Sequence, residues 1–243
     1  MKAKRVLENA IHGWFLLMGL VTVGCVLLIS VYLIISGIPA IREIGLVKFL
    51  FGKVWDSNAA TPQFGILSFI LTSVYGTAGA ILLGVPVGFM TAVFLAKMAP
   101  PRLKAVVSSA VSLLAGIPSV VYGFFGMIVL VPAVQAMVKS DFFKTVLHVK
   151  GGKGMSLFTA SVLLGIMILP TIITVSKTSL DAVPESYYEG SLALGATHER
   201  SVFYAVLPAA KSGVLSAVIL GIGRAIGETM AVVMVAGNQT WMP

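Results

Sequence analysis

The chain has 243 residues, of which 58% are apolar and 11% are charged, whereas soluble globular domains contain about 25% charged residues. This composition excludes an ordinary soluble domain and favours a protein embedded in a bilayer. The net charge of +8 does not indicate nucleic-acid binding, because the basic residues lie in short loops and tails without interleaved aromatic residues; membrane topology and anionic headgroups explain it better.

Five long apolar stretches are predicted to cross the membrane. Pro86 in the second stretch and Pro118 in the third each remove a backbone donor, so both positions are predicted to kink. The sequence therefore predicts an all-α integral membrane protein, with one transmembrane domain over residues 1–243. The five stretches run over residues 11–35, 64–96, 103–138, 157–175 and 213–236.

The basic residues give the predicted orientation. The short loop over residues 97–104 carries Lys97, Arg102 and Lys104, and positive charge in short loops favours the cytoplasmic side. We therefore expect a multi-pass protein with a cytoplasmic N-terminus. Five spans then leave Pro243 outside, and because no charged tail follows the last apolar stretch, we expect a sixth span to be truncated.

No metal site, cofactor or enzymatic activity is predicted. Cys25 is the single cysteine, and the three histidines are far apart and show no ligand spacing. The sequence has no phosphate-cradling ATPase loop and suggests no arrangement of nucleophile, base and acid.

One ionised pair interrupts the last apolar stretch. Arg224 and Glu228 are four residues apart, a spacing that places both side chains on one face of a continuous helix. Ionisable residues at membrane depth usually face a bundle interior or a water-filled path, so the pair predicts passage of a polar substrate. The alternative is a structural ion pair between helices. Ser119 is a further path candidate, because it follows Pro118, where a kink frees backbone groups.

The segment over residues 177–211 is mixed polar and apolar, and it is predicted to lie in the cytoplasm. Pro184 suits a first helical position, Gly195 suits a helix end and Thr197 suits a helix cap, while Pro208 is expected to end the second helix. We therefore expect two short helices that hinge near Gly195. Their apolar side chains either contact a partner or rest at the membrane interface.

This segment resembles the "EAA" loop of ABC importer permeases, whose pattern is Glu-Ala-Ala, three residues, Gly, nine residues, then Ile-x-Leu-Pro. Four residues of the chain match it: Glu189, Gly195, Leu207 and Pro208. Three small residues depart from it: Gly190, Ser191 and Ala205. The resemblance implies a coupling helix that docks in a cleft of an ATPase subunit.

Two further segments, residues 115–126 and 223–232, are similar to the high-affinity phosphate importer, the Pst system, and within it to the PstC-type permease. The resemblance implies a type I ABC importer transmembrane domain with six spans, of which five are present here. It also implies a sister permease of the PstA type, an ABC ATPase dimer and an extracytoplasmic phosphate-binding protein, in a bacterial or archaeal plasma membrane.

The resulting hypothesis is inward passage of inorganic phosphate. Arg224 offers a forked donor for phosphate oxygens, and Glu228 is expected to pair with Arg224 at rest and to be displaced, or to gate, as phosphate passes. The nearest alternative is a permease for sulfate or molybdate. A different class is a proton-coupled secondary transporter that uses Glu228 as a relay, and a third is a scaffold that would tolerate loss of Arg224.

Overall fold

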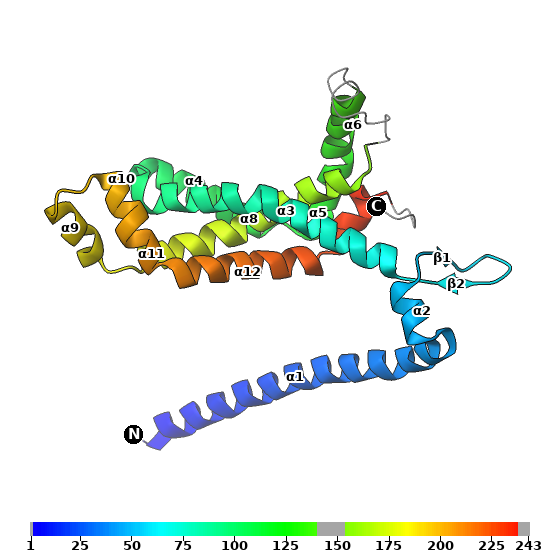
Figure 1. The fold of residues 1–243 in the computed structure, drawn as a ribbon. Helices are drawn as coiled ribbons and strands as arrows, with labels where there is room; N and C mark the ends of the chain where they lie inside the picture. Colours follow the sequence, from blue (N-terminus) through cyan, green and yellow to red (C-terminus); the bar gives the residue numbers. More distant parts are fainter. Residues whose placement is uncertain (1, 140–153, 238–243) are drawn as a thin grey trace. The chain divides into compact units, whose positions relative to one another are not determined.

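A computed structural model describes residues 2–139 and 154–237, so the predicted position of Pro243 lies outside the described residues. The described chain is mostly helical (Figure 1), as predicted, and it contains one small two-stranded hairpin. The chain divides into two compact units, residues 1–67 and residues 68–243. They are described separately below.

The first unit is built on one long helix, α1 (Lys2–Ile44), which extends well beyond the predicted span of residues 11–35. Its side chains from Leu7 to Ile35 are exposed and almost all apolar. Such a surface suits contact with lipid or with another apolar helix. The chain turns at Gly45, whose φ of 86° is a left-handed conformation that glycine adopts without steric cost.

After this turn, α2 (Leu46–Phe51) leads into a hairpin of β1 (Trp55–Asp56) and β2 (Gln63–Phe64). The rings of Trp55 and Phe64 pack edge to face at 5.5 Å between centroids. The backbones at Gly52 and Gly65 come so close that a Cβ on either would overlap the other residue. These contacts fix the hairpin beside α2.

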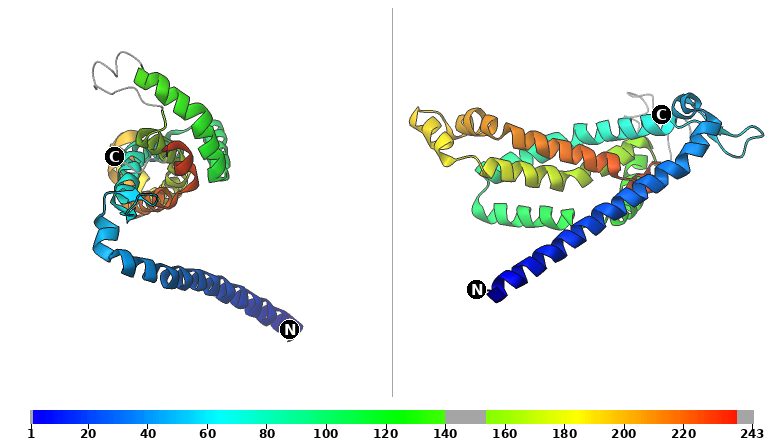
Figure 2. Two further views of the ribbon diagram at one scale, coloured as in Figure 1. Left: turned by 90° about the vertical axis from the view of Figure 1, so that its right-hand side faces the viewer. Right: turned by 90° about the horizontal axis from the view of Figure 1, so that it is seen from below.

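The second unit is organised around α8 (Leu157–Asp181), which contributes many of the buried residues. On either side of it lie α3 (Leu67–Val93) and α12 (Lys211–Gly227) (Figures 1 and 2). Glycines allow the close approach, because a Cβ at Gly84 of α3 would lie 2.8 Å from Ile168, and one at Gly221 of α12 would lie 3.0 Å from Ile172. The core is therefore a glycine-lined packing of three helices.

The predicted third stretch is broken where Pro118 was expected to interrupt it. A π-helical turn, η1 (Phe94–Met98), ends α3 and is followed by α4 (Pro101–Ala115). The chain then breaks over residues 116–118 and resumes as α5 (Ser119–Phe125), the π-helical η2 (Gly126–Leu130) and α6 (Val131–Lys139). By contrast, α3 continues through Pro86 without interruption.

Among the described residues, four helical segments are long and apolar enough to cross a bilayer, or five if the bent pair of residues 198–209 and 211–227 forms one span. This count agrees with the predicted architecture. The four are Leu7–Ile44, Leu67–Met98, Ser119–Lys139 and Leu157–Asp181. The remaining elements are α9 (Glu185–Ala193), α10 (His198–Ser201), the π-helical η3 (Val202–Val206), α11 (Leu207–Ala209) and α13 (Met230–Val235).

Gly84→Ala is expected to destabilise the second unit by about 1–3 kcal/mol, the usual cost of overpacking. The added Cβ would meet Ile168 and, at 2.9 Å, the backbone oxygen of Gly165, which cannot move aside as a flexible side chain can. Thermal unfolding of the purified permease in detergent measures the effect. Gly223→Ala is the matched control, because its Cβ would have no neighbour within 4 Å among the described residues. Equal melting temperatures for the two variants would contradict the packing described here.

Candidate functional site

Glu228 lies at a break in the last predicted span and not inside a helix. The continuous helix expected over residues 213–236 is wrong: α12 ends at Gly227, Glu228 is extended (φ −79°, ψ 117°), and α13 begins at Met230. Oε1 of Glu228 accepts a hydrogen bond from the N–H of Ala231 at 3.1 Å. The carboxylate therefore satisfies one of the free donors at the start of α13, where a negative charge is also favoured by the helix dipole.

Arg224 contacts α8. Its Nη1 donates to Oγ1 of Thr171 at 3.2 Å. The side chain is half-buried. The predicted pairing with Glu228 is wrong, because no nitrogen–oxygen contact within 4.0 Å joins these two described residues. The break explains this result: beyond Gly227 the chain no longer follows the helical course that would bring Glu228 onto the face of Arg224.

Ser119 is the first residue of α5, directly after the break in the third stretch. This break is closed by Tyr122, whose hydroxyl donates to the backbone oxygen of Leu114 at 2.8 Å. Ser119 itself is half-buried, and within the described chain no hydrogen bond connects it to Arg224 or Glu228. Ser119 therefore lies three residues before Tyr122 on α5, and the described residues show no contact that joins it to Arg224.

The two broken helices meet at α5 and α13. A Cβ at Gly123 would lie 2.7 Å from Sδ of Met234 and 3.0 Å from Cα of Ala231, so the two helices are in close contact at this glycine. Tyr122, Ala231 and Val235 share one buried apolar cluster. This contact packs α13, which follows the break after α12, against α5. Irregular backbone at membrane depth is tolerated where it is buried in protein or lines a cavity.

Chemically, this site offers a cation with unused donors. The guanidinium carries five N–H donors in a planar fork, of which the Thr171 contact uses one. An oxyanion with several acceptor oxygens fits such a fork. Thr171 was not identified from the sequence, because nothing in the spacing of α8 relates it to Arg224.

The segment predicted to couple the permease to a partner has the expected two short helices. The α9 helix ends before Gly195, which has a φ of 86°. Oγ1 of Thr197 accepts a hydrogen bond from the N–H of Arg200 and caps α10. The hinge near Gly195 and the cap at Thr197 are therefore confirmed. Pro184 is the residue before the first helical position, one place earlier than predicted.

The expected helix end at Pro208 is confirmed to within one residue. The helical stretch that Thr197 caps runs over His198–Ala209, and the chain turns at Ala210, by 72°, into α12. Leu207, directly before Pro208, packs partly buried against a cluster that includes Val202, Val206 and Leu180.

Two side-chain hydrogen bonds hold α9 against α10. The hydroxyl of Tyr188 and Nδ1 of His198 are 2.7 Å apart, and Oγ of Ser201 donates to Oγ of Ser191 at 3.0 Å. These contacts were missed by sequence reasoning, which gave no reason to relate residues ten positions apart across a hinge. They make the two short helices one unit.

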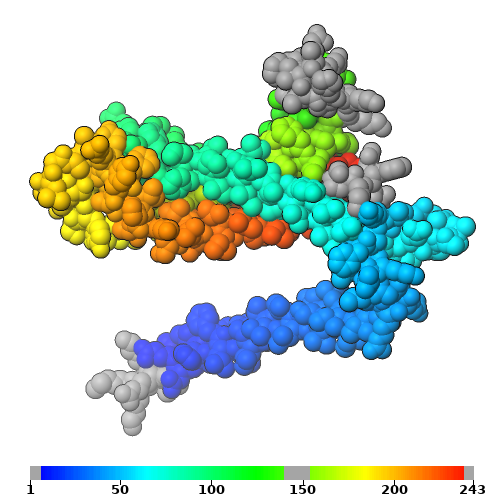
Figure 3. Space-filling view, in the orientation of Figure 1, coloured from blue at the N-terminus to red at the C-terminus, as the bar shows by residue number. Residues whose placement is uncertain are grey.

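The outer surface of this unit carries exposed apolar side chains among charged ones. Leu194 is 91% exposed and Tyr187 is 54% exposed, and Glu189 is exposed as well. Figure 3 shows α9 and α10, in yellow and light orange, at one end of the second unit. Large exposed apolar side chains grouped on one helical unit are typical of an interaction surface.

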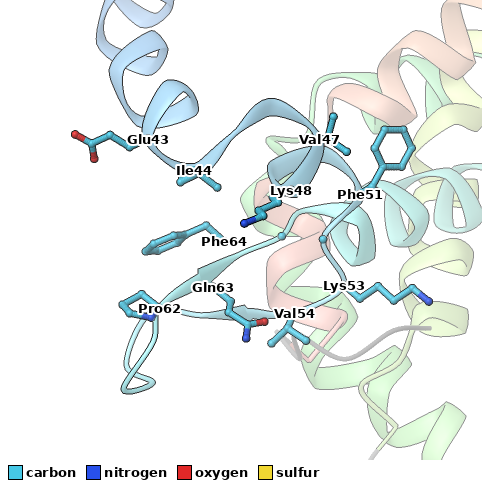
Figure 4. A pocket seen from close by; sticks show the side chains of 12 residues that line it. Glu43, Ile44, Val47, Lys48, Phe51, Lys53, Val54, Pro62, Gln63 and Phe64 are labelled. Atoms are coloured by element: carbon cyan, nitrogen blue, oxygen red, sulfur yellow. The ribbon is translucent and has the colours of Figure 1, made fainter.

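A separate hollow of about 760 Å³ lies in the first unit, between α2 and the hairpin (Figure 4). In this view Lys48 extends toward Phe64, whereas Lys53 points away from Phe64. The lining residues lie between Glu43 and Gly65, so none of the predicted site residues contributes to it. Among the described residues, no three His, Cys, Asp or Glu side chains are grouped so as to hold a metal ion.

Comparison with known proteins gives consistent matches. Residues 84–243 match the family described as "Binding-protein-dependent transport system inner membrane component". The chain is 36% identical over 226 residues to the "Probable ABC transporter permease protein YqgH" of Bacillus subtilis, covering 92% of this chain and 70% of that protein. It is 34% identical over 223 residues to the "Phosphate transport system permease protein PstC" of Haemophilus influenzae, covering 88% and 70%. It is 33% identical over 235 residues to "PstC 2" of Mycobacterium tuberculosis, covering 92% and 72%.

Proposed function

Because this chain belongs to the family of binding-protein-dependent transport system inner membrane components, and within it to the PstC-type permeases, we propose that it forms part of the inward path for inorganic phosphate. It is a permease subunit of an ABC transporter in the inner membrane, and its relatives are permeases and not enzymes. The observation that carries the proposal is the half-buried Arg224, whose guanidinium contacts Thr171 through one donor where two broken helices meet.

Phosphate suits this position for two reasons. Its negative charge offsets the positive charge of Arg224, because an unpaired cation at membrane depth costs free energy. Its several oxygens also match the planar guanidinium fork. Several relatives bear the name phosphate transport system permease. In the proposed mechanism Arg224 receives the anion, Ser119 lies farther along the path, and Glu228 holds the break between α12 and α13 open through its contact with Ala231.

The energy source is proposed to be ATP hydrolysis in a separate ABC ATPase dimer. The exposed surface of α9 and α10 supports this assignment, because two hydrogen bonds join the helices into one unit and this unit exposes large apolar side chains, as a docking element does. In this scheme Glu189 lies on the docking helix, Gly195 sets its hinge, and Leu207 and Pro208 anchor the following turn. The other partners are a PstA-type sister permease and an external phosphate-binding protein.

Reconstituted transport tests the proposal. The permease, its sister, the ATPase and the phosphate-binding protein are placed in liposomes, and uptake of labelled phosphate is followed with and without ATP. We expect uptake that requires ATP and that excess sulfate or molybdate leaves unchanged. Uptake driven by a proton gradient without ATP would favour a secondary transporter, and competition by sulfate or molybdate would favour a permease for that anion.

The proposed orientation places the N-terminus and residues 177–211 in the cytoplasm. Glu189→Cys, in a Cys25→Ser background, is expected to react with a membrane-impermeant thiol reagent in inverted vesicles and not in intact cells, because residue 189 is exposed on α9. Asn58→Cys is the matched control, since Asn58 is exposed in the loop after α1 and should show the opposite pattern. Labelling of position 189 in intact cells would contradict the orientation.

A further inference from the structure

One side chain bridges the break between α4 and α5. The hydroxyl of Tyr122 donates to the backbone oxygen of Leu114, eight residues earlier, at 2.8 Å. Among the described residues, no backbone hydrogen bond joins α5 to α4, and the bond from Tyr122 is the one hydrogen bond of any kind that does so. The Tyr122 hydroxyl is therefore the polar link between these two helices.

The two helices pack against different neighbours. α4 packs chiefly against α8, whereas α5 packs chiefly against α13. The contact between α5 and α13 is close, because a Cβ on Gly123 would lie 3.0 Å from Cα of Ala231. The helices α5 and α13 therefore form a pair, and the hydroxyl of Tyr122 ties this pair to α4.

The ring and the hydroxyl of Tyr122 have separate effects. The residue is 5% exposed, and it belongs to an apolar cluster with Leu163, Met167, Ala231 and Val235. A phenylalanine ring would fill the same space, so packing in this cluster does not require the oxygen. Apolar packing is non-directional, whereas a hydrogen bond restricts both distance and angle. The hydroxyl therefore contributes orientation, and the ring contributes burial.

The orientation of α5 matters because both of its ends are irregular. Residues 116–118 break the chain before Ser119, and the π-helical η2 begins at Gly126, directly after Phe125. Neither end of α5 is thus continued by a regular helix that would fix its direction. Ser119 lies three residues before Tyr122, which is about one helical turn. A change at the Tyr122 hydroxyl is therefore expected to move Ser119 as well.

We propose that Tyr122 is a positioning residue for phosphate passage, because its hydrogen bond to Leu114 fixes the start of α5 and thereby the place of Ser119. The inference rests on the proposed function, in which Ser119 lies on the inward path. Tyr122 acts through α5 and does not bind the anion, since its hydroxyl hydrogen is donated to Leu114. Loss of this hydroxyl would slow the passage of phosphate without weakening the docking of the external phosphate-binding protein.

Tyr122→Phe tests the link, and Tyr75→Phe is the matched control, because Tyr75 is exposed on α3 and its hydroxyl makes no hydrogen bond within the described chain. Each is combined with Cys25→Ser and Ser119→Cys in the assembled transporter, and modification of position 119 by a small thiol reagent is quantified by mass spectrometry. We expect Tyr122→Phe to speed this modification about fivefold, the factor that one net hydrogen bond contributes to an opening equilibrium. Tyr75→Phe should leave the rate unchanged. Ser109→Cys, exposed on α4, is the control reporter and should react equally in every background.

Reconstituted uptake then measures the effect on transport, with native serine at position 119. We expect Tyr122→Phe to lower the maximal rate of phosphate uptake per assembled complex several-fold. The concentration of phosphate-loaded binding protein that gives half-maximal uptake should not change. The melting temperature should fall by at most about 2–4 °C, the usual effect of one lost hydrogen bond in a chain of this size. Tyr75→Phe should match the wild type in all three measurements.

Each other outcome overturns a named part of the inference. An unchanged rate at position 119 in Tyr122→Phe would show that the hydroxyl does not hold the start of α5. Faster modification with normal uptake would remove the positioning role. An equal rise at position 109, or the same changes in Tyr75→Phe, would show general loosening and not a specific link. No phosphate uptake by the wild-type complex would contradict the proposed function, whereas wild-type uptake that Tyr122→Phe leaves intact would contradict the role of Tyr122 alone.

Discussion

Arg224→Lys is expected to lower phosphate uptake by about tenfold or more, although lysine keeps the positive charge. Its single ammonium lacks the planar fork that binds two phosphate oxygens at once, and a loss of about 1.4 kcal/mol corresponds to a factor of ten. Reconstituted uptake measures the effect. The variant should assemble normally, because among the described residues Arg224 makes a single hydrogen bond, the weak one to Thr171 at 3.2 Å.

The Thr171→Val variant tests whether Arg224 binds phosphate or mainly holds α12 against α8. It removes the hydroxyl that accepts from Arg224 but leaves the guanidinium and its charge in place. If Arg224 serves mainly to hold α12 against α8, Thr171→Val should lower uptake as much as Arg224→Lys does. If Arg224 binds phosphate, Thr171→Val should retain most of the uptake.

Removing the charges of Arg224 and Glu228 together is not expected to give a transporter that takes up phosphate. The double variant Arg224→Leu with Glu228→Leu would rescue transport only if the two residues balanced each other, and Glu228 instead contacts the N–H of Ala231. We therefore expect an assembled but inactive protein. Normal uptake by the assembled double variant would remove the substrate role of Arg224.

Glu228 is expected to act by stabilising the start of α13 through its hydrogen bond with Ala231. Glu228→Gln keeps an oxygen that accepts from Ala231, whereas Glu228→Leu leaves that N–H at the start of α13 without its partner. Glutamine should therefore preserve uptake and thermal stability better than leucine. Equal loss of uptake in both variants, with stability unchanged, would show that the carboxylate charge is required.

The sequence predicted most of the architecture for physical reasons that can be named. Apolar length alone identifies helices able to cross a bilayer, and Pro118 interrupts the third stretch because it lacks a donor. Gly195 and Thr197 were placed correctly because left-handed backbone and helix capping each restrict the residue type strongly. These features depend on residues that are close together in the chain, so they can be predicted from a single sequence.

The errors concern partners that are distant in sequence. The spacing of Arg224 and Glu228 suggested a pair because it assumes a continuous helix, and residues 227–229 break that helix. Thr171 could not be related to Arg224, because their contact depends on how α8 and α12 pack through Gly221.

Gly195→Val is expected to lower phosphate uptake and transport-linked ATP hydrolysis together. At a φ of 86°, a residue with a Cβ is strained by roughly 1–2 kcal/mol, and a β-branched side chain is among the least tolerated there. Because an added Cβ would meet no atom of the described residues within 4 Å, the effect comes from the backbone alone. The strain would shift the angle between α9 and α10, which Tyr188 and His198 otherwise fix.

Three measurements make this prediction specific to coupling. Gly195→Asn should retain more activity than the valine variant, because asparagine tolerates the left-handed conformation better. Gly190→Ala should remain active, since Gly190 lies inside α9 with open space around it and alanine favours a helix. Phosphate binding to the external protein should be unchanged in all three variants. If the valine variant transports normally, or if Gly190→Ala loses activity to the same extent, the bend at Gly195 does not set the coupling geometry.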